Sequence, residues 1–383
     1  MTFITFNDLQ YMIVYLPIIL LSILFTYLAE KFHKVNGLFV FFSAMALLVL
    51  SVFAGCRDLT VGHDVMLYEY GIYKSAHYSD SFIDLLNSDV SGIEFIFLLI
   101  NYIGIKLYDN IHFVLGFISF VTSLFAYLAC IRYKKNAPLW LLFAGYLLLN
   151  YASSLNIMRQ NVAVAICLYA YTILKDNGLN RYFYVVAILA MFSHNTAIIP
   201  IAALFFYHFI PKMSSKIYNR VLFILLLGIS VVYYSIDHIL SSISLVLQKD
   251  YTIYGDFSIT ESGWAELIIP YTYIILICLL FYCSMIGKKK GVISMAEWNE
   301  YKCTILICVF IFIMGATLTG SMLRLAYYFI TFCVFYIVQI PYRIITSRDK
   351  RILVNVLLIL LFVLMFFKTT AGSVDYSSTI LSI

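Results

Sequence analysis

Three arginines of the chain stand in contexts that suit the binding of an anion. They are Arg57 in GCRDLTVGHDVMLYEY, Arg159 in SSLNIMRQNVA and Arg324 in SMLRLAYYF. A planar guanidinium binds phosphate oxygens through two parallel hydrogen bonds, so three arginines that converge on one cavity suit a pyrophosphate. Each arginine taken alone is equally explained as a side chain that reaches from the end of a span to the membrane surface. Together they predict an anion site.

Polar and aromatic residues accompany each arginine at helical spacing. They are Asp64 and Tyr68 after Arg57, Asn156 and Gln160 beside Arg159, and Tyr327 and Tyr328 after Arg324. Residues three and four apart share one face of a helix. Polar groups on one face of an otherwise apolar helix line a wet cavity more often than they face lipid. A guanidinium with two phenols suits a sugar phosphate.

Two further groups could carry a proton or contact a sugar. His194, in MFSHNTAIIP, could act as a base or donate a hydrogen bond to an anionic oxygen, although a lone histidine in an apolar stretch is usually structural. Asp64 by itself is equally explained as a solvated loop carboxylate. Glu261 and Trp264 in ITESGWAE could contact a sugar, but a tryptophan there is also typical of the aromatic belt of a membrane protein.

The elements that must position these residues are membrane helices. The chain is 63% hydrophobic and only 12% charged, which is too little charge to cover the surface of a soluble domain of 383 residues. The first apolar run follows an acidic residue and precedes Lys31 and Lys34, the reverse of a cleavable signal peptide, so we expect a retained span. The sequence holds no nucleotide-binding glycine pattern and no zinc ligand set, and its net charge of +5 does not indicate nucleic-acid binding, because the basic residues sit in short loops between spans.

Apolar runs and basic residues together predict about twelve crossings with both termini outside. Most lysines and arginines fall in short connecting segments, which the positive-inside rule makes cytoplasmic. The three arginines of the anion site then fall at the outer ends of spans. The predicted spans are Tyr11–Leu28, Gly37–Cys56, Ile111–Ile131, Pro138–Leu155, Ile157–Leu174, Tyr182–His194, Ala197–Phe209, Val221–Leu245, Trp264–Ile286, Thr304–Leu318, Met322–Ile340 and Ile352–Phe367.

Two apolar stretches are assigned by the charges that flank them. Counting Gly92–Leu107 as a span would place Arg132–Lys135 outside, so we predict a helix that lies along the outer membrane interface. A break near Ser193–Thr196 keeps both Arg181 and Lys212 inside, and it leaves two halves that are short for full spans. The whole chain, 1–383, is predicted to be one integral membrane domain with long outer loops at about 57–110 and 248–263.

The order of these motifs resembles the EpsG-like branch of the Wzy-type polysaccharide polymerases. The elements that carry the resemblance are Arg57, Gly62-x-Asp64 and Tyr68, then Gly92 and Glu94, Arg159-Gln160, Phe192-Ser193-His194, and Arg324 with Tyr327. They cover most of the chain. The helix opening at Glu94 reads Ser-Gly-Ile-Glu where the family more usually has a Glu-Pro-Gly-Phe type of sequence, so Glu94 is only a candidate sugar contact.

The resemblance implies an all-helical membrane glycosyltransferase of the GT-C kind. Such an enzyme joins oligosaccharide repeat units carried on undecaprenyl pyrophosphate at the outer face of the bacterial inner membrane, for O-antigen, capsule or exopolysaccharide. Arg159 and Arg324, with Arg57, would stabilise the leaving pyrophosphate.

Asp64 is the first candidate for the base and His194 the second. We expect inversion by direct displacement with no cofactor or bound metal, because no second acidic residue stands in a tight motif with Asp64; Asp58 and Glu69 keep a metal site open as an alternative. The expected partners are a lipid-linked donor and acceptor, with a chain-length regulator as a candidate.

Other functions use the same kind of cavity. A flippase for lipid-linked oligosaccharide would need gates on both sides of the membrane, and such transporters often show two similar halves. The polar residues here cluster outside only, and no internal repeat is visible, so the transferase is favoured. A ligase for finished polysaccharide and a transferase for one side-branch sugar use the same leaving group and stay open as alternatives.

Overall fold

The computed structural model describes residues 6–62, 64–88, 90, 92–234, 264–317, 320–370 and 376–382. Every regular element in these residues is helical. The longer helices are α1 (Phe6–Lys31), α2 (Asn36–Gly55), α6 (Ile111–Tyr133), α7 (Leu139–Asn156), α8 (Met158–Asn177), α11 (Ser215–Tyr234), α13 (Trp264–Lys289), α14 (Met295–Thr317), α15 (Gly320–Ile344) and α16 (Arg348–Thr370). The shorter ones are η1 (Val65–Glu69), α3 (Tyr70–Tyr78), α4 (Phe82–Leu86), α5 (Phe95–Leu107), α9 (Arg181–Ser193), η2 (Asn195–Ala197), α10 (Ile198–Phe209) and η3 (Ile210–Lys212).

Each predicted span coincides with one helix, which confirms the helical segmentation of the chain. The predicted break near Ser193–Thr196 is also confirmed, since α9 ends at Ser193 and α10 begins at Ile198. The end of Val221–Leu245 beyond residue 234 lies outside the described residues, as does Leu318, the last residue of Thr304–Leu318. In the described part, five helices are long and apolar enough to cross a membrane by themselves: Ile13–Lys31, Asn36–Gly55, Ile111–Tyr133, Arg324–Ile344 and Arg348–Phe367.

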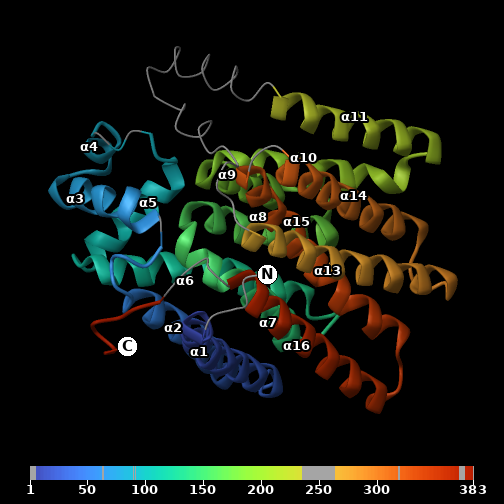
Figure 1. Ribbon diagram of the computed structural model, residues 1–383, viewed down its shortest axis with the longest axis horizontal. Helices are drawn as coiled ribbons and strands as arrows, with labels where there is room; N and C mark the ends of the chain where they lie inside the picture. Colours follow the sequence, from blue (N-terminus) through green and yellow to red (C-terminus); the bar gives the residue numbers. More distant parts are fainter. Residues whose placement is uncertain are drawn as a thin grey trace. The chain divides into compact units, whose positions relative to one another are not determined.

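The chain divides into two compact units, 1–202 with 338–383 and 203–337. In the first unit α1 packs on α2, α2 on α6, α6 on α8 and α8 on α9, while α1 and α16 both pack on α7 (Figure 1). The helices α7 and α8 are buried along most of their length, and α1, α2 and α16 expose many large apolar side chains. This is the pattern of a helix bundle whose outer helices face lipid.

The second unit contains α11, α13 and α14 and the larger part of α15. Here α14 packs against α13 and α11. Two buried polar contacts join its elements: the hydroxyls of Tyr207 and Thr304 lie 2.7 Å apart, and the hydroxyl of Tyr336 donates to Glu300 at 3.0 Å. Buried polar groups in a membrane helix bundle need such partners, because lipid offers none.

One residue, Ile157, separates α7 from α8 in the first unit. Its backbone leaves the helical conformation, with φ −110° and ψ 68°. The side-chain amide of Asn161 donates to the carbonyls of Ser153 and Ile157 at 3.2 and 3.0 Å, in addition to the backbone N–H groups that these carbonyls accept, so it ties the last turn of α7 to the first turn of α8. The break brings the first turn of α8, which includes Arg159, to the end of the bundle where the loop after α2 begins.

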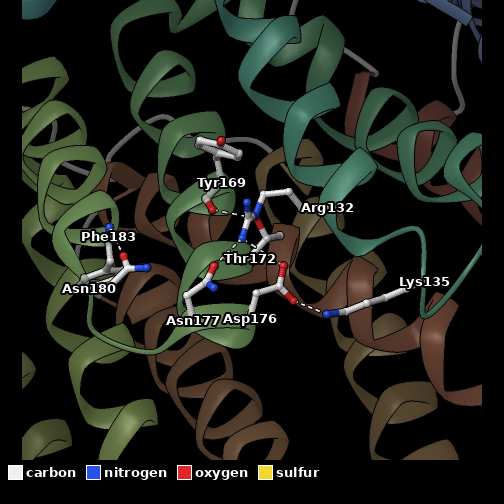
Figure 2. A network of polar contacts seen from close by, with 8 residues as sticks. All are labelled: Arg132, Lys135, Tyr169, Thr172, Asp176, Asn177, Asn180 and Phe183. Carbon is white, nitrogen blue, oxygen red and sulfur yellow. Dashed lines mark hydrogen bonds and ion pairs between the residues drawn. The ribbon is translucent and has the colours of Figure 1, made fainter. Parts of the chain in front are cut away.

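A polar network fastens α6 and α8 together at the opposite end of α8 (Figure 2). Arg132 donates to Asp176 at 3.0 Å and to Asn177 at 2.9 Å, and Lys135 pairs with the other oxygen of Asp176. Just beyond it, Gly178 ends α8 with a positive φ of 65°, and the side chain of Asn180 caps α9 through the amide of Phe183.

The chain's C-terminal segment packs on the end of α2 from which the loop of Arg57 starts. Tyr376 stacks on Phe53 with ring centroids 4.0 Å apart, and its hydroxyl donates to the Phe53 carbonyl at 2.7 Å. Asp58 accepts from both the backbone amide and the hydroxyl of Thr379 at 2.8 Å. The segment therefore holds this loop from a position more than three hundred residues further along the chain.

Candidate functional site

Arg57, the first predicted anion ligand, is buried against the break between α7 and α8. It is 1% exposed and donates from Nη1 to the Leu155 carbonyl at 2.8 Å and from Nη2 to the Met158 sulfur at 3.0 Å. The same carbonyl touches Gly62, which has a φ of +96° and whose missing Cβ would lie 2.2 Å from it. Only glycine fits there. Arg57 and Gly62 thus clamp the end of α7 at Leu155, four residues before Arg159.

Arg159 is held between an acid and a phenol. Its side chain is 8% exposed, and Nη1 lies 3.2 Å from Oε2 of Glu94. The guanidinium carbon also lies 4.2 Å from the ring centroid of Tyr68, which is cation–π geometry. A stacked guanidinium has its plane fixed, so its remaining donors point in defined directions.

Glu94 also contacts His194, and so joins the arginine to the histidine. Oε1 of Glu94 lies 2.6 Å from Nδ1 of His194. Glu94 stands just before the first turn of α5, and His194 follows the last turn of α9 in extended conformation. When Nδ1 donates its hydrogen to the carboxylate, Nε2 of the imidazole is left to accept a proton. The pair therefore has the arrangement of an oriented general base.

Several groups set the charge of Glu94. Burial alone would raise the pKa of Glu94, but the hydrogen bond and charge of His194, and then the charge of Arg159, outweigh it and lower the pKa. Glu94 is therefore ionised at neutral pH. The side chain of His194, at 18% exposed, is the most accessible of the three, while those of Glu94 and Arg159 are 7% and 8% exposed.

A short π-helix, η1, carries two buried carboxyl groups beside this cluster. Asp64 precedes it and is 8% exposed, and Glu69 ends it and is 0% exposed. The charges of Arg57, Asp64 and Arg159 all act on Glu69. The sequence predicts no contact between Glu69 and the arginines, because α-helical spacing pairs Asp64 with Tyr68 and not with a residue five positions on.

The structure brings together residues from four separate segments of the predicted set: Tyr68, Glu94, Arg159 and His194. Asp64 and the buried Gln160 belong to the same elements as Tyr68 and Arg159. Glu94, expected only as a sugar contact, is the residue that joins the others.

The remaining predicted residues belong to the second unit or to no described segment. Arg324 and Tyr327 lie one turn apart on α15, and Arg324 is exposed. Trp264 is the first residue of α13. Glu261 lies outside the described residues.

Comparison with known proteins gives a match to a family model. Residues 40–381 match the model of the EpsG family, a range that contains every residue of the site described above. Neither the curated proteins nor the solved structures contain a match to the chain.

Proposed function

The chain belongs to the EpsG family, and from this premise we propose that it is the glycosyltransferase that polymerises lipid-linked oligosaccharide repeat units. Family membership makes it a multi-pass membrane protein of polysaccharide biosynthesis, and the apolar helices agree with that. More specifically, we propose a Wzy-type polymerase whose donor and acceptor are both carried on undecaprenyl pyrophosphate.

One observation carries the mechanism: Glu94 contacts His194 and Arg159 at the same time, at 2.6 and 3.2 Å. A glycosyl transfer from a pyrophosphate needs a base at the acceptor hydroxyl and positive charge at the leaving group. Here the candidate base, His194, and the positive charge, Arg159, contact the two oxygens of one carboxylate. Glu94 orients the imidazole and holds the guanidinium, so it fixes the spacing between the base and the anion ligand.

The proposed step is a single displacement. The acceptor hydroxyl loses its proton to Nε2 of His194, and its oxygen forms the new bond to the anomeric carbon. The bond from that carbon to the pyrophosphate oxygen breaks, and the electron pair leaves with the lipid pyrophosphate. Arg159 donates hydrogen bonds to the charge that develops there, and the ring of Tyr68 keeps its guanidinium in plane. This displacement inverts the anomeric centre and needs no metal.

The geometry favours His194 over Asp64 as the base. His194 is the more exposed of the two and has a carboxylate to orient it, whereas Asp64 is buried at the start of η1. We therefore propose His194 as the catalytic base and Asp64 as a neighbour that tunes the charge of the site. Arg57 is a positioning residue in this scheme, because its Nη1 and Nη2 donate to Leu155 and Met158. Arg324 is proposed as a further pyrophosphate ligand, with Tyr327 beside it on α15.

Two observations support action at the outer face of the bacterial inner membrane. The network of Arg132, Lys135 and Asp176 stands at one end of α8 and Arg159 at the other. By the positive-inside rule the basic end is cytoplasmic, which supports an exterior position for the Arg159 end.

The number of crossings is also part of the proposal. The helices α7 and α8 are mostly buried among their neighbours, so they have little need of an apolar surface toward lipid. We propose that they cross the membrane with the five apolar helices, with the remaining long helices α11, α13 and α14, and with the short helices α9 and α10, which gives about twelve crossings and a GT-C-like bundle.

Polysaccharide profiling of a strain that lacks the protein tests this function. Wild type should restore the long-chain ladder, and His194→Ala should not, while single lipid-linked repeat units are still made and exposed outside. His33→Asn, at an exposed position far from the site in sequence, is the matched control and should restore the ladder. Immunoblots of membrane fractions would verify equal protein levels. Repeat units that accumulate on the cytoplasmic side would instead establish a flippase.

A further inference from the structure

Glu69 is a buried carboxyl group that the mechanism above does not use. It is 0% exposed, and neither of its oxygens has a hydrogen bond of ordinary geometry with a described residue, although the Asn101 amide lies nearby. Oδ1 of Asn101 and Nε of Arg57 likewise have no hydrogen-bond partner within the described chain. Buried polar atoms are nearly always paired, so a group of them next to a site requires an explanation.

The π-helix η1 explains how this carboxyl reaches the site. The amide of Tyr70 donates to the carbonyl of Val65, five residues before it, and this wider turn aligns residues 64 and 69. Asp64, Val65 and Glu69 are buried, whereas Met66 and Leu67 are more than half exposed on the outward side. Short π-helices of this kind are frequent at functional sites, because they insert one residue into a helix to re-aim a side chain.

Burial and nearby charges set the protonation state of Glu69. Burial raises its pKa to about 8, Asp64 acts in the same direction, and Arg57 and Arg159 only partly oppose them. Glu69 therefore holds a proton at neutral pH. When Glu69 is protonated, its O–H is a donor, and Asn101 Oδ1 is an unused acceptor nearby. When Glu69 is ionised, its oxygens are acceptors, and Arg57 Nε is an unused donor. The surroundings thus offer a partner for each form.

We propose that Glu69 is a positioning residue that acts through Arg159. While the Glu69 carboxyl is neutral, Arg159 has one negative neighbour fewer, so the site binds an anionic leaving group more tightly. Glu94 already gives Arg159 one acidic neighbour, at 3.2 Å. An ionised Glu69 would add another, beside Asp64, and would compete with a pyrophosphate for the same positive charge. This inference rests on the proposed function, because it takes the pyrophosphate of the lipid-linked donor as the ligand.

Binding of a polyprenyl pyrophosphate to the purified full chain in lipid nanodiscs tests the inference. Wild type and Glu69→Gln would be compared at about pH 6.5 and about pH 9.5, on either side of the titration of Glu69. The glutamine has the shape of the protonated acid but no titratable proton. Between the two pH values, we expect the Kd of wild type to rise by a factor that is on the order of tenfold larger than the factor for Glu69→Gln. Asp80→Asn, at an exposed loop position, is the control and should follow wild type.

Two outcomes would overturn it. An equal rise of Kd in wild type and Glu69→Gln would exclude the role of Glu69 and leave the proposed function intact. No binding by wild type at either pH would overturn the proposed function, and this inference with it. Infrared spectra of the same samples report the protonation of Glu69 directly and do not depend on how stable each variant is. The band of a protonated carboxyl should be absent in Glu69→Gln, and in wild type it should disappear as the pH rises through about 8. If Glu69→Gln fails to fold, Glu69→Leu takes its place.

Discussion

Glu94 and His194 are a hundred residues apart in sequence and their side chains meet at 2.6 Å. The contact is formed because α5 and α9 pack against each other, with Glu94 just before the first turn of one helix and His194 just after the last turn of the other. The same carboxylate then reaches Arg159.

This contact predicts how substitutions at the two residues will differ. His194→Ala should lower kcat by about 10²- to 10⁴-fold, because it removes the proposed base. Glu94→Gln keeps the shape of the side chain but removes the charge that orients the imidazole, so we expect a loss of about 10- to 100-fold. Turnover of lipid-linked repeat units by the purified protein in nanodiscs would measure both. Full activity of His194→Ala would exclude His194 as the base and return Asp64 to that role.

The positions of the helices can be predicted from the sequence more fully than the contacts within the site. Apolar runs of span length fix where α1, α2, α6 and α16 form, and flanking charges were enough to predict the break after Ser193. The burial of α7 and α8 cannot be derived in this way, because a helix surrounded by protein needs no apolar surface, and the polar first turn of α8 gives no sign of its depth.

Within the site, local spacing predicted each residue but not the contacts between them. Arg159 was singled out by its position at the outer end of a span, and Tyr68 by its spacing from Asp64. Their stacking depends on how η1 is seated against α8, which no local pattern encodes. The position of Glu69 beside the arginines was not predicted for the same reason, since a π-turn cannot be distinguished from an α-turn by the residue types in VMLYE.

The stacking of Tyr68 on Arg159 predicts a difference between two substitutions. Tyr68→Phe keeps the aromatic face over the guanidinium and should leave the KM for the lipid-linked donor within about twofold. Tyr68→Leu removes the face and should raise that KM by about 3- to 30-fold with a smaller change in kcat, because the cation–π contact holds the anion ligand and takes no part in proton transfer. Steady-state kinetics with varied donor would separate the two variants. If both raise KM equally, the phenol hydroxyl is the group that matters, and if neither raises KM, Tyr68 does not hold the anion ligand.

Gly62 is expected to tolerate no side chain. A Cβ there would lie 2.2 Å from the Leu155 carbonyl, and its φ of +96° is unfavourable for any other residue. Gly62→Ala should therefore destabilise the protein by about 1–3 kcal/mol and lower its Tm, through displacement of the loop that carries Arg57. Gly71→Ala is the matched control, because a Cβ at Gly71 would meet no atom within 4 Å in a helical segment. Thermal unfolding in detergent would compare the two, and an unchanged Tm for Gly62→Ala would contradict the packing described for this loop.

The burial of Glu69 makes stability depend on pH. Its pKa is about 8 in the folded protein against 4.5 for an ordinary glutamate, so between these values the folded state holds a proton that the unfolded state has lost. Stability must then fall as the pH rises from about 4.5 to about 8, and level off above that range. Glu69→Gln lacks this term. The Tm of wild type relative to Glu69→Gln should fall steadily from pH 5 to about pH 8. A difference in Tm that is constant across this range would mean that Glu69 is already ionised in the folded protein.

The network at the far end of α8 should matter for stability and not for turnover. Arg132 and Asp176 are 29% and 20% exposed, and partly exposed ion pairs contribute about 0.2–1 kcal/mol. We expect Arg132→Gln and Asp176→Asn each to lower the Tm by a few degrees at most and to leave polymerisation within about twofold of wild type. A polymerase that works from the Arg159 end of α8 needs no movement at the Asp176 end, whereas a flippase must open there to admit its cargo. A large gain or loss of transport activity in these variants, with polymerisation absent, would therefore favour the transporter.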